Sequence, residues 1–269
     1  MTQAPGINNV DPDVPPSESP RLVALFVTCL ADLMRPSVAF ASVKLLEDAG
    51  CDVVVPRAQS CCGQPGYNSG DYTGAATLAK QVIRTFENYE HVVLPSGSCA
   101  GMMIRHYPRL FEGEWRTRAE AFASRVRELT DFLHSVCGYR PTVQGGLTRV
   151  AYHDSCAGLR ELGLRDAPRE LLAAAGVAVH ELQQRDVCCG FGGTFCAKMP
   201  AISAKMADDK LRDLETTGAD TLLAGDLGCL LALAGRASRC GKKLAFRHVA
   251  EVLAGQLEEP AIGVAPERR

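Results

Sequence analysis

The tripeptide Cys-Cys-Gly occurs twice in this chain, at residues 61–63 and 188–190. Each copy follows a lone cysteine after 31 intervening residues, and each precedes a further cysteine after 35 or 38 residues. This repeated spacing indicates an internal duplication, and four thiolates per repeat are a donor set for bound metal. The sequence therefore predicts two metal sites with eight ligands, namely Cys29, Cys61, Cys62 and Cys99 in the first site and Cys156, Cys188, Cys189 and Cys229 in the second.

Four thiolates can hold either a tetrahedral zinc ion or a [4Fe–4S] cluster. Structural zinc sites usually contain Cys-x-x-Cys pairs, and this chain has none. Two adjacent cysteines can instead reach different iron atoms, and the glycines at 63 and 190 leave room for an inorganic core beside the backbone. These features favour [4Fe–4S] clusters and leave zinc open for one of the two sites.

The remaining four cysteines lie outside the repeat. Free cysteine often serves as a small buried apolar residue, and we expect that role for them. They are Cys51, Cys137, Cys196 and Cys240.

A few polar residues beside the repeated cysteines could add to the sites. His153 could be a ligand or a proton donor, although a hydrogen-bonded histidine at a strand end is the preferred interpretation. His248 lies in a helical apolar pattern, which indicates packing or capping, and Asp154 and Asp226 could orient their neighbours. No nucleophile–base pair and no dinucleotide-binding fingerprint occurs, so the catalytic residues stay unknown.

Apolar runs typical of strands alternate with stretches of helical periodicity in both halves of the chain. This alternation predicts an α/β fold of two duplicated βαβ-type domains with parallel sheets, at 21–147 and 148–269, after a disordered leader at 1–20. Strands are predicted at 21–28, 51–55, 91–94, 149–153, 177–182 and 220–225, and helices at 36–49, 71–89, 114–136, 168–175, 201–215 and 246–257.

All eight repeated cysteines fall in predicted loops that follow strands. In parallel sheets these loops gather at the carboxyl ends of the strands, where ligands bind. We therefore expect the thiols of each half to converge at one edge of its sheet.

The overall composition excludes several classes of function. The chain has 269 residues with a net charge of −2, which argues against nucleic acid as a partner. No apolar run reaches the 18 or so residues of a transmembrane segment, and the first residues lack the features of a signal peptide. We therefore expect a cytoplasmic protein, in which thiols stay reduced and metal ligation is favoured over disulfides.

Four motifs give the sequence a resemblance to a known family. They are PSGSCAGM at 95–102, HDSCAGLREL at 153–162, CCGFGGTFCAKMP at 188–200 and GDLGC at 225–229. Together they resemble the cysteine-rich CCG-domain iron–sulfur oxidoreductases, and most of all the lactate utilization protein A branch. The resemblance implies electron transfer in a complex that oxidises L-lactate to pyruvate, together with a ferredoxin-type iron–sulfur subunit and a third lactate-utilization subunit.

One departure from the fuller family pattern affects this interpretation. That pattern ends in Cys-x-x-Cys, but here Met102 and Ala232 occupy the place of the last cysteine. The missing thiolate argues against a disulfide-cleaving site and for electron transfer by a subunit that is active only with its partners. Alternatives are the iron–sulfur subunit of a glycolate or D-lactate oxidase, a heterodisulfide-reductase-like complex, or, in another class, a zinc-stabilised scaffold module.

Overall fold

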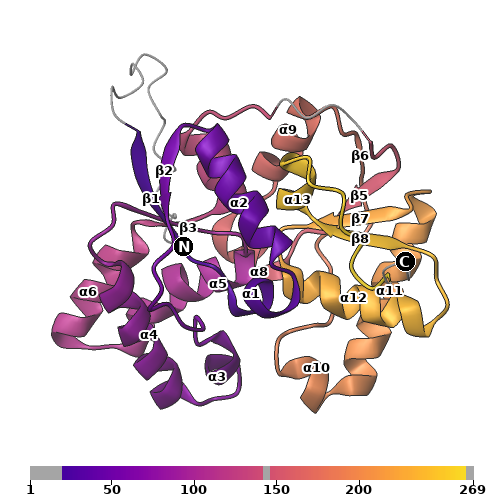
Figure 1. The fold of residues 1–269 in the computed structure, drawn as a ribbon. Coiled ribbons are helices and arrows are strands. Elements are labelled where there is room, and N and C mark those ends of the chain that lie inside the picture. Colours follow the sequence, from indigo (N-terminus) through magenta and orange to yellow (C-terminus); the bar gives the residue numbers. More distant parts are fainter. Residues whose placement is uncertain (1–19, 142–145, 265–269) are drawn as a thin grey trace, which may run out of the picture.

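The computed structural model describes residues 20–141 and 146–264, which form two α/β halves side by side (Figure 1). Apart from Pro20, the predicted disordered leader lies outside the described residues. The first half contains β1 (Arg21–Leu25), α1 (Cys29–Met34), α2 (Ser37–Asp48), β2 (Cys51–Val54), α3 (Gln64–Asn68), α4 (Tyr72–Phe86), β3 (His91–Leu94), α5 (Gly97–Gly101), the π-helical η1 (Met102–His106), the 3₁₀-helical η2 (Tyr107–Leu110), α6 (Gly113–Ala123), β4 (Val126–Glu128), α7 (Leu129–Asp131) and the π-helical η3 (Phe132–Val136).

The second half repeats this plan with fewer short helices. It contains β5 (Val150–Tyr152), α8 (Cys156–Leu162), α9 (Asp166–Ala174), β6 (Val179–His180), α10 (Phe195–Lys198), α11 (Pro200–Thr216), β7 (Thr221–Ala224), α12 (Leu227–Arg239), β8 (Ala245–His248) and α13 (Val249–Leu253). Among the helices described, none has the length and apolar character required to cross a bilayer.

Each half contains one four-stranded sheet whose strand pairs are all parallel. The strand orders are β2-β1-β3-β4 and β6-β5-β7-β8, so the two sheets have the same topology. The central strands are buried: β7 is buried along its whole length, and residues 23–25 of β1 are inaccessible. A continuous apolar run is what a parallel sheet covered by helices on both faces requires. The predicted α/β fold with two parallel sheets is confirmed.

The fourth strand of each sheet was not predicted. The expected helix at 114–136 is wrong in its middle, because α6 ends at Ala123 and β4 follows; similarly, β8 occupies the start of the expected helix at 246–257. In β4, Val126 and Glu128 are buried on either side of the exposed Arg127. Three residues are too few for this period of two to be recognised, and pairing with β3 overrides the local helical preference.

The two sheets share one hydrophobic core, in which Leu25 and Val93 of the first half lie in the same cluster as Tyr152 and Leu223 of the second. A buried ion pair also joins the halves, since the Arg35 guanidinium lies 2.7 Å from a carboxylate oxygen of Glu251. Helices α5 and α8 approach so closely that a Cβ added at Gly97 would lie 3.0 Å from the Cα of Gly158. These contacts fix the two cysteine-bearing edges relative to each other, while the boundary between residues 147 and 148 stays a prediction.

Candidate metal centres

The first four cysteines converge at the carboxyl edge of the first sheet. Cys29 begins α1 directly after β1, Cys99 lies in α5 after β3, and the adjacent pair precedes α3. The Sγ atoms of Cys29 and Cys61 are 3.9 Å apart, and those of Cys62 and Cys99 are 3.4 Å apart. Four thiols from three different strand ends thus form one cluster, as the spacing predicts.

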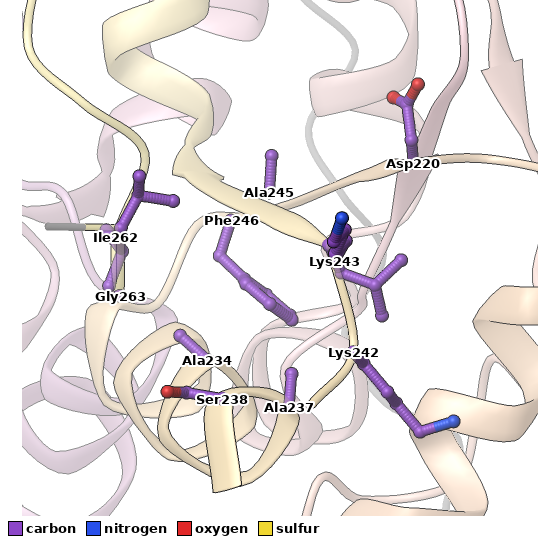
Figure 2. A pocket seen from close by; sticks show the side chains of 12 residues that line it. Asp220, Ala234, Ala237, Ser238, Lys242, Lys243, Ala245, Phe246, Ile262 and Gly263 are labelled. Atoms are coloured by element: carbon purple, nitrogen blue, oxygen red, sulfur yellow. The ribbon is translucent and has the colours of Figure 1, made fainter. Parts of the chain in front are cut away.

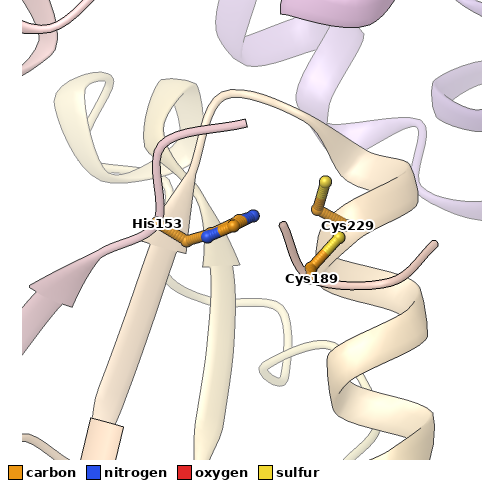
Figure 3. A group of neighbouring side chains, drawn as sticks. All are labelled: His153, Cys189 and Cys229. Atoms are coloured by element: carbon orange, nitrogen blue, oxygen red, sulfur yellow. The ribbon is translucent and has the colours of Figure 1, made fainter. Parts of the chain in front are cut away.

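The second set has the same layout. Cys156 begins α8, Cys229 lies in the first turn of α12, and the thiols of Cys156 and Cys188 are close enough to shift each other's pKa. The Sγ atoms of Cys189 and Cys229 and a ring nitrogen of His153 all lie within 4.8 Å of one another (Figure 3). Figure 3 shows the imidazole pointing from the end of its strand toward the two thiols.

The lone cysteine and the last cysteine of each set lie on helices, whereas all eight were expected in loops. Cys29, Cys99, Cys156 and Cys229 each lie in the first turn of the helix that follows a strand. Backbone N–H groups in a first helical turn have no partner within the helix and favour negative charge nearby. This placement therefore suits thiolates better than an irregular loop does.

The glycine of each Cys-Cys-Gly tripeptide has a left-handed backbone conformation, with φ of +83° at Gly63 and +86° at Gly190. This turn directs the N–H of Gly63 to the Sγ of Cys61 at 3.4 Å, and that of Gly190 to the Sγ of Cys188 at 3.3 Å. A side chain would strain the backbone at both positions. The glycine is therefore required for the conformation that stabilises charge on the first sulfur of the pair.

The packed thiols perturb one another in the same way in both sets. Hydrogen bonds from its neighbours lower the pKa of Cys61 to about 2, while the same interactions raise the pKa of Cys29. In the second set the pKa of Cys188 falls to about 2 and that of Cys156 rises. One sulfur in each set can carry charge only while others keep their protons, because like charges in contact repel each other. Full deprotonation needs a cation among the sulfurs, so both donor sets fit a metal ion or an iron–sulfur cluster.

The surroundings of His153 differ from the sequence-based interpretation. Its side chain is fully buried, and neither ring nitrogen has a hydrogen-bond partner in the part of the chain that the structure describes. The preferred interpretation, a hydrogen-bonded histidine at a strand end, is therefore wrong. Burial and the nearby Lys210 lower the pKa of His153 to about 3, which keeps the imidazole neutral. A neutral, buried and unpartnered imidazole beside thiols is available as a metal ligand.

Lys210 is a second feature of this site, and the sequence analysis did not single it out. It comes from α11, has only 1% of its surface exposed, and donates a hydrogen bond to the carbonyl oxygen of Gln184 at 2.5 Å. Its ammonium group interacts electrostatically with the thiols of Cys188 and Cys189. The signal was present in the sequence, because Lys210 falls between Ala207 and residues 211 and 214 on the buried face of its helix.

Two aspartates next to the sites orient their neighbours, as predicted. Both carboxylate oxygens of Asp154 accept hydrogen bonds from Arg169, at 2.9 Å each. Asp226 accepts hydrogen bonds from the Ser96 hydroxyl at 3.1 Å and from the backbone N–H of Ser98 at 3.0 Å. Asp226 therefore ties the loop before Cys229 to the loop before Cys99 across the two halves.

Glu128 and His248 occupy corresponding positions, each at the end of a fourth strand and at the N-cap of the following helix. The Glu128 carboxylate accepts hydrogen bonds from the N–H groups of Thr130 and Asp131, and His248 Nδ1 accepts one from Ala250. The predicted packing or capping role of His248 is confirmed. Both side chains are buried, and burial raises the pKa of Glu128 to about 7 while it lowers that of His248.

A cavity of about 330 Å³ opens onto the first set of thiols, and all four cysteines of that set line it. The opposite wall comes from the second half and includes Phe191, Thr194 and Leu227. Phe191 packs so tightly against α12 that a Cβ added at Gly228 would lie 2.4 Å from its ring. The loop that carries the second Cys-Cys pair thus closes a mostly apolar chamber over the first set.

A larger hollow of about 490 Å³ lies away from the cysteines (Figure 2). Asp220, Lys242 and Phe246 are among its lining residues, and no thiol is. It lies where β7 and β8 begin, at the opposite edge of the second sheet from the clustered cysteines. It is therefore separate from the candidate metal centres.

Comparison with known proteins gives the same picture of two repeated units. The family described as "Cysteine-rich domain" (CCG) matches residues 23–104 and 150–234. The chain is 46% identical over 234 residues to "Lactate utilization protein A" of Anoxybacillus flavithermus, covering 86% of this chain and 98% of that protein. It is 42% identical over 240 residues to "Lactate utilization protein A 2" of Bacillus cereus, covering 88% and 99% respectively.

One solved structure has a similar fold. The crystal structure of a hypothetical protein from Helicobacter pylori superposes with a TM-score of 0.60 at 13% sequence identity. The match covers 89% of this chain and 49% of the other, so this chain spans about half the length of that protein. At this identity the likeness concerns the fold alone.

Proposed function

We propose, since the chain belongs to the cysteine-rich CCG domain family, that it is the iron–sulfur subunit of an L-lactate dehydrogenase complex. In this role it passes electrons from L-lactate oxidation toward an acceptor. Curated relatives that carry the name lactate utilization protein A match nearly their whole length to this chain, which supports the pathway. The chain works in the cytoplasm, where its free cysteines stay reduced.

The observation that carries this proposal is the convergence of two sets of four thiols whose complete ionisation needs a cation. A [4Fe–4S] cluster held by such thiolates would supply one-electron transfer. Cys29, Cys61, Cys62 and Cys99 would hold it in the first half, and Cys156, Cys188, Cys189 and Cys229 in the second. The protein's own contribution is to hold the sulfurs, to donate N–H groups to them and to limit access of water.

The two sites have different tasks in this proposal. The first set faces the chamber between the halves, so we assign electron exchange with a partner to that side. The second set has a buried neutral imidazole within reach of two thiols, and zinc accepts mixed cysteine and histidine ligands. His153 thus specifically favours zinc as the alternative occupant of the second site.

Partner subunits complete the proposed activity. The chain contains no Cys-x-x-Cys relay and no dinucleotide-binding fingerprint, so a substrate-oxidising group must come from elsewhere. We assign that part to a ferredoxin-type iron–sulfur subunit and a third lactate-utilization subunit. Activity is then expected from the assembled complex and not from this chain alone.

Deletion of the gene, followed by growth on L-lactate as sole carbon source, tests the pathway. We expect no growth on L-lactate, rescue by the wild-type gene, and rescue by a Cys240→Ser control, because Cys240 is exposed and outside both sets. Growth on D-lactate and on glycolate should stay normal. A defect on glycolate or D-lactate instead would assign the subunit to the other oxidase, and normal growth on all three would contradict the proposal.

Anaerobic purification with iron, sulfide and zinc analysis tests the cofactor independently of the pathway. We expect four iron and four sulfide per occupied cluster. The reduced protein should also give an EPR signal. A colourless protein with zinc in both sites and no sulfide would favour the scaffold module and overturn the electron-transfer role.

A further inference from the structure

A third pair of thiols lies outside both candidate metal centres. The Sγ atoms of Cys51 and Cys137 are 3.8 Å apart, although the two residues are separated by 86 positions in the sequence. Cys51 has 5% of its surface exposed, and Cys137 is partly exposed. Both were expected to be small buried apolar residues, and a contact between them was not predicted.

The pair lies at the edge of the first sheet opposite the metal ligands. Cys51 is the first residue of β2 and pairs in register with Arg21, the first residue of β1. Cys137 directly follows η3, the last helical turn before the second half. The metal thiols follow the carboxyl ends of the same strands, so the length of the sheet separates the two groups of sulfurs.

The surroundings favour a reactive thiolate over an inert thiol. The hydrogen bond between the two sulfurs lowers the pKa of Cys51, and the nearby Arg21 guanidinium lowers it further. The same hydrogen bond and burial raise the pKa of Cys137, so Cys51 carries the charge of the pair and the more exposed Cys137 keeps its proton. Cys51 can therefore accept the Cys137 proton across their 3.8 Å contact when Cys137 reacts. Cys51 thus supplies a base and Cys137 an accessible sulfur, and together they can take part in thiol–disulfide exchange.

We propose that Cys51 and Cys137 are a modification site that forms a reversible intramolecular disulfide by exchange with a low-molecular-weight disulfide. Cys137 passes its proton to the Cys51 thiolate and attacks one sulfur of the small disulfide, which gives a mixed disulfide and releases one small thiolate. Cys51 then attacks the Cys137 sulfur, forms the Cys51–Cys137 bond and releases the second small thiol. In total the pair loses two electrons with its thiol protons, and one small disulfide is reduced to two small thiols.

Closing the bond requires the sulfurs to approach from 3.8 Å to a bond length of about 2.05 Å. A side-chain rotation at the partly exposed Cys137 can supply this movement, because Gly138 directly after it leaves the local backbone adaptable. The bond would fasten the start of β2 to the end of the first half. Because it closes a long loop, we expect it to raise the Tm by about 5 °C.

Peptide mapping after oxidation of the metal-loaded, anaerobically purified protein with oxidised glutathione tests the site. After free thiols are alkylated, trypsin should release residues 45–57 joined to residues 128–149, and dithiothreitol should separate them. The visible absorbance of the metal centres should not change during this cycle. Cys51→Ser and Cys137→Ser should abolish the cross-link, and the Cys240→Ser control should keep it.

Three results would overturn the proposal. In the first, both peptides remain fully alkylated at a glutathione poise that oxidises ordinary vicinal dithiols. In the second, only mixed disulfides with glutathione appear at Cys137. In the third, the cross-link forms only after the metal centres have lost their absorbance, which would show that it requires unfolding. None of these results depends on lactate oxidation, so failure here is distinguishable from failure of the proposed function.

Discussion

The two cysteine sites have the same layout of thiols but different surroundings. Phe26 and His153 each precede the lone cysteine of their set by three residues, and both are fully buried. The first site therefore has an aromatic hydrocarbon where the second has a neutral imidazole. An imidazole can bind metal or accept a proton, whereas a phenyl ring can do neither.

The helix that covers each Cys-Cys-Gly turn shows a second difference. A Cβ on the glycine of the turn would contact the carbonyl oxygen of Ala75 in the first half and of Ser203 in the second. Seven residues further along the same helices, Val82 occupies the first half and Lys210 the second, both buried. The first site thus has apolar surroundings and an open chamber, while the second has a buried cation. The two halves thus share the four cysteines, and the residues around them can set different chemistry in each site.

Replacing one buried cysteine in each site should have the largest effect, because it should remove the metal of that site. Cys62→Ser and Cys189→Ser each replace a fully packed sulfur, so each variant should lose the metal of its own site and keep the other. We expect total metal to fall by about half in each and growth on L-lactate to fail with Cys62→Ser. Metal analysis beside the Cys240→Ser control checks this. Loss of both metals from either single variant would show that the sites do not form independently.

Glu128 and His248, the N-caps that follow the fourth strands, should make the stability of the fold depend on pH in opposite directions. The pKa of a glutamate is 4.5 in the unfolded chain, whereas that of Glu128 in the fold is about 7. Between these pH values the folded state therefore binds a proton that the unfolded state has lost. Stability from Glu128 is therefore complete below pH 4.5 and falls by about 3 kcal/mol as the pH rises to 7. Urea unfolding of wild type and Glu128→Gln at several pH values measures the difference. Parallel profiles for the two proteins would refute the assignment.

His248 should act in the opposite direction. Its pKa is lowered by burial, so its contribution to stability is present above the unfolded value of 6.5 and is lost as the pH falls below it. His248→Gln should therefore gain stability relative to wild type on acidification, whereas Glu128→Gln gains it as the pH rises. The two variants provide controls for each other.

Alanine at the two Cys-Cys-Gly glycines should reveal how tightly each turn is packed. Both substitutions strain a left-handed backbone by about 1–2 kcal/mol. At Gly190 the new Cβ would also lie 2.7 Å from the carbonyl oxygen of Ser203, whereas at Gly63 the nearest atom is 3.3 Å away. We expect Gly190→Ala to lower the free energy of unfolding by about 2 kcal/mol more than Gly63→Ala. Equal losses in urea unfolding would mean that the second turn can relax.

Replacing His153 by phenylalanine, the residue type at the corresponding position 26 of the first half, should have the smallest effect. His153→Phe places a phenyl ring beside Cys189 and Cys229, and we expect the second site to release its metal to a chelator at least about ten times faster. The first site should be unchanged, and the reciprocal Phe26→His variant is the matched control. Unchanged release from both sites would show that His153 does not bind the metal.

Much of the fold could be predicted because local patterns report it. The apolar run at 91–94 and the helix around residues 201–215 came close to their observed bounds, since both have strong periodicity and clear ends. β4 and β8 could not be predicted, because their short buried segments gain stability mainly from pairing with a neighbouring strand. The pairing of Cys51 with Cys137 was equally hidden, because no spacing rule relates them.

The two sets of four cysteines could be identified from the sequence alone, because a repeated spacing is visible without any knowledge of distance. The sequence also indicates the alternation of strands and helices, which brings the ends of parallel strands to one edge. The surroundings of each set become visible when the chain is folded. The unpartnered imidazole of His153, the buried ammonium of Lys210 and the chamber over the first set depend on contacts between residues far apart in the chain. Burial and charge at a site are sums over such contacts, and a linear pattern does not contain them.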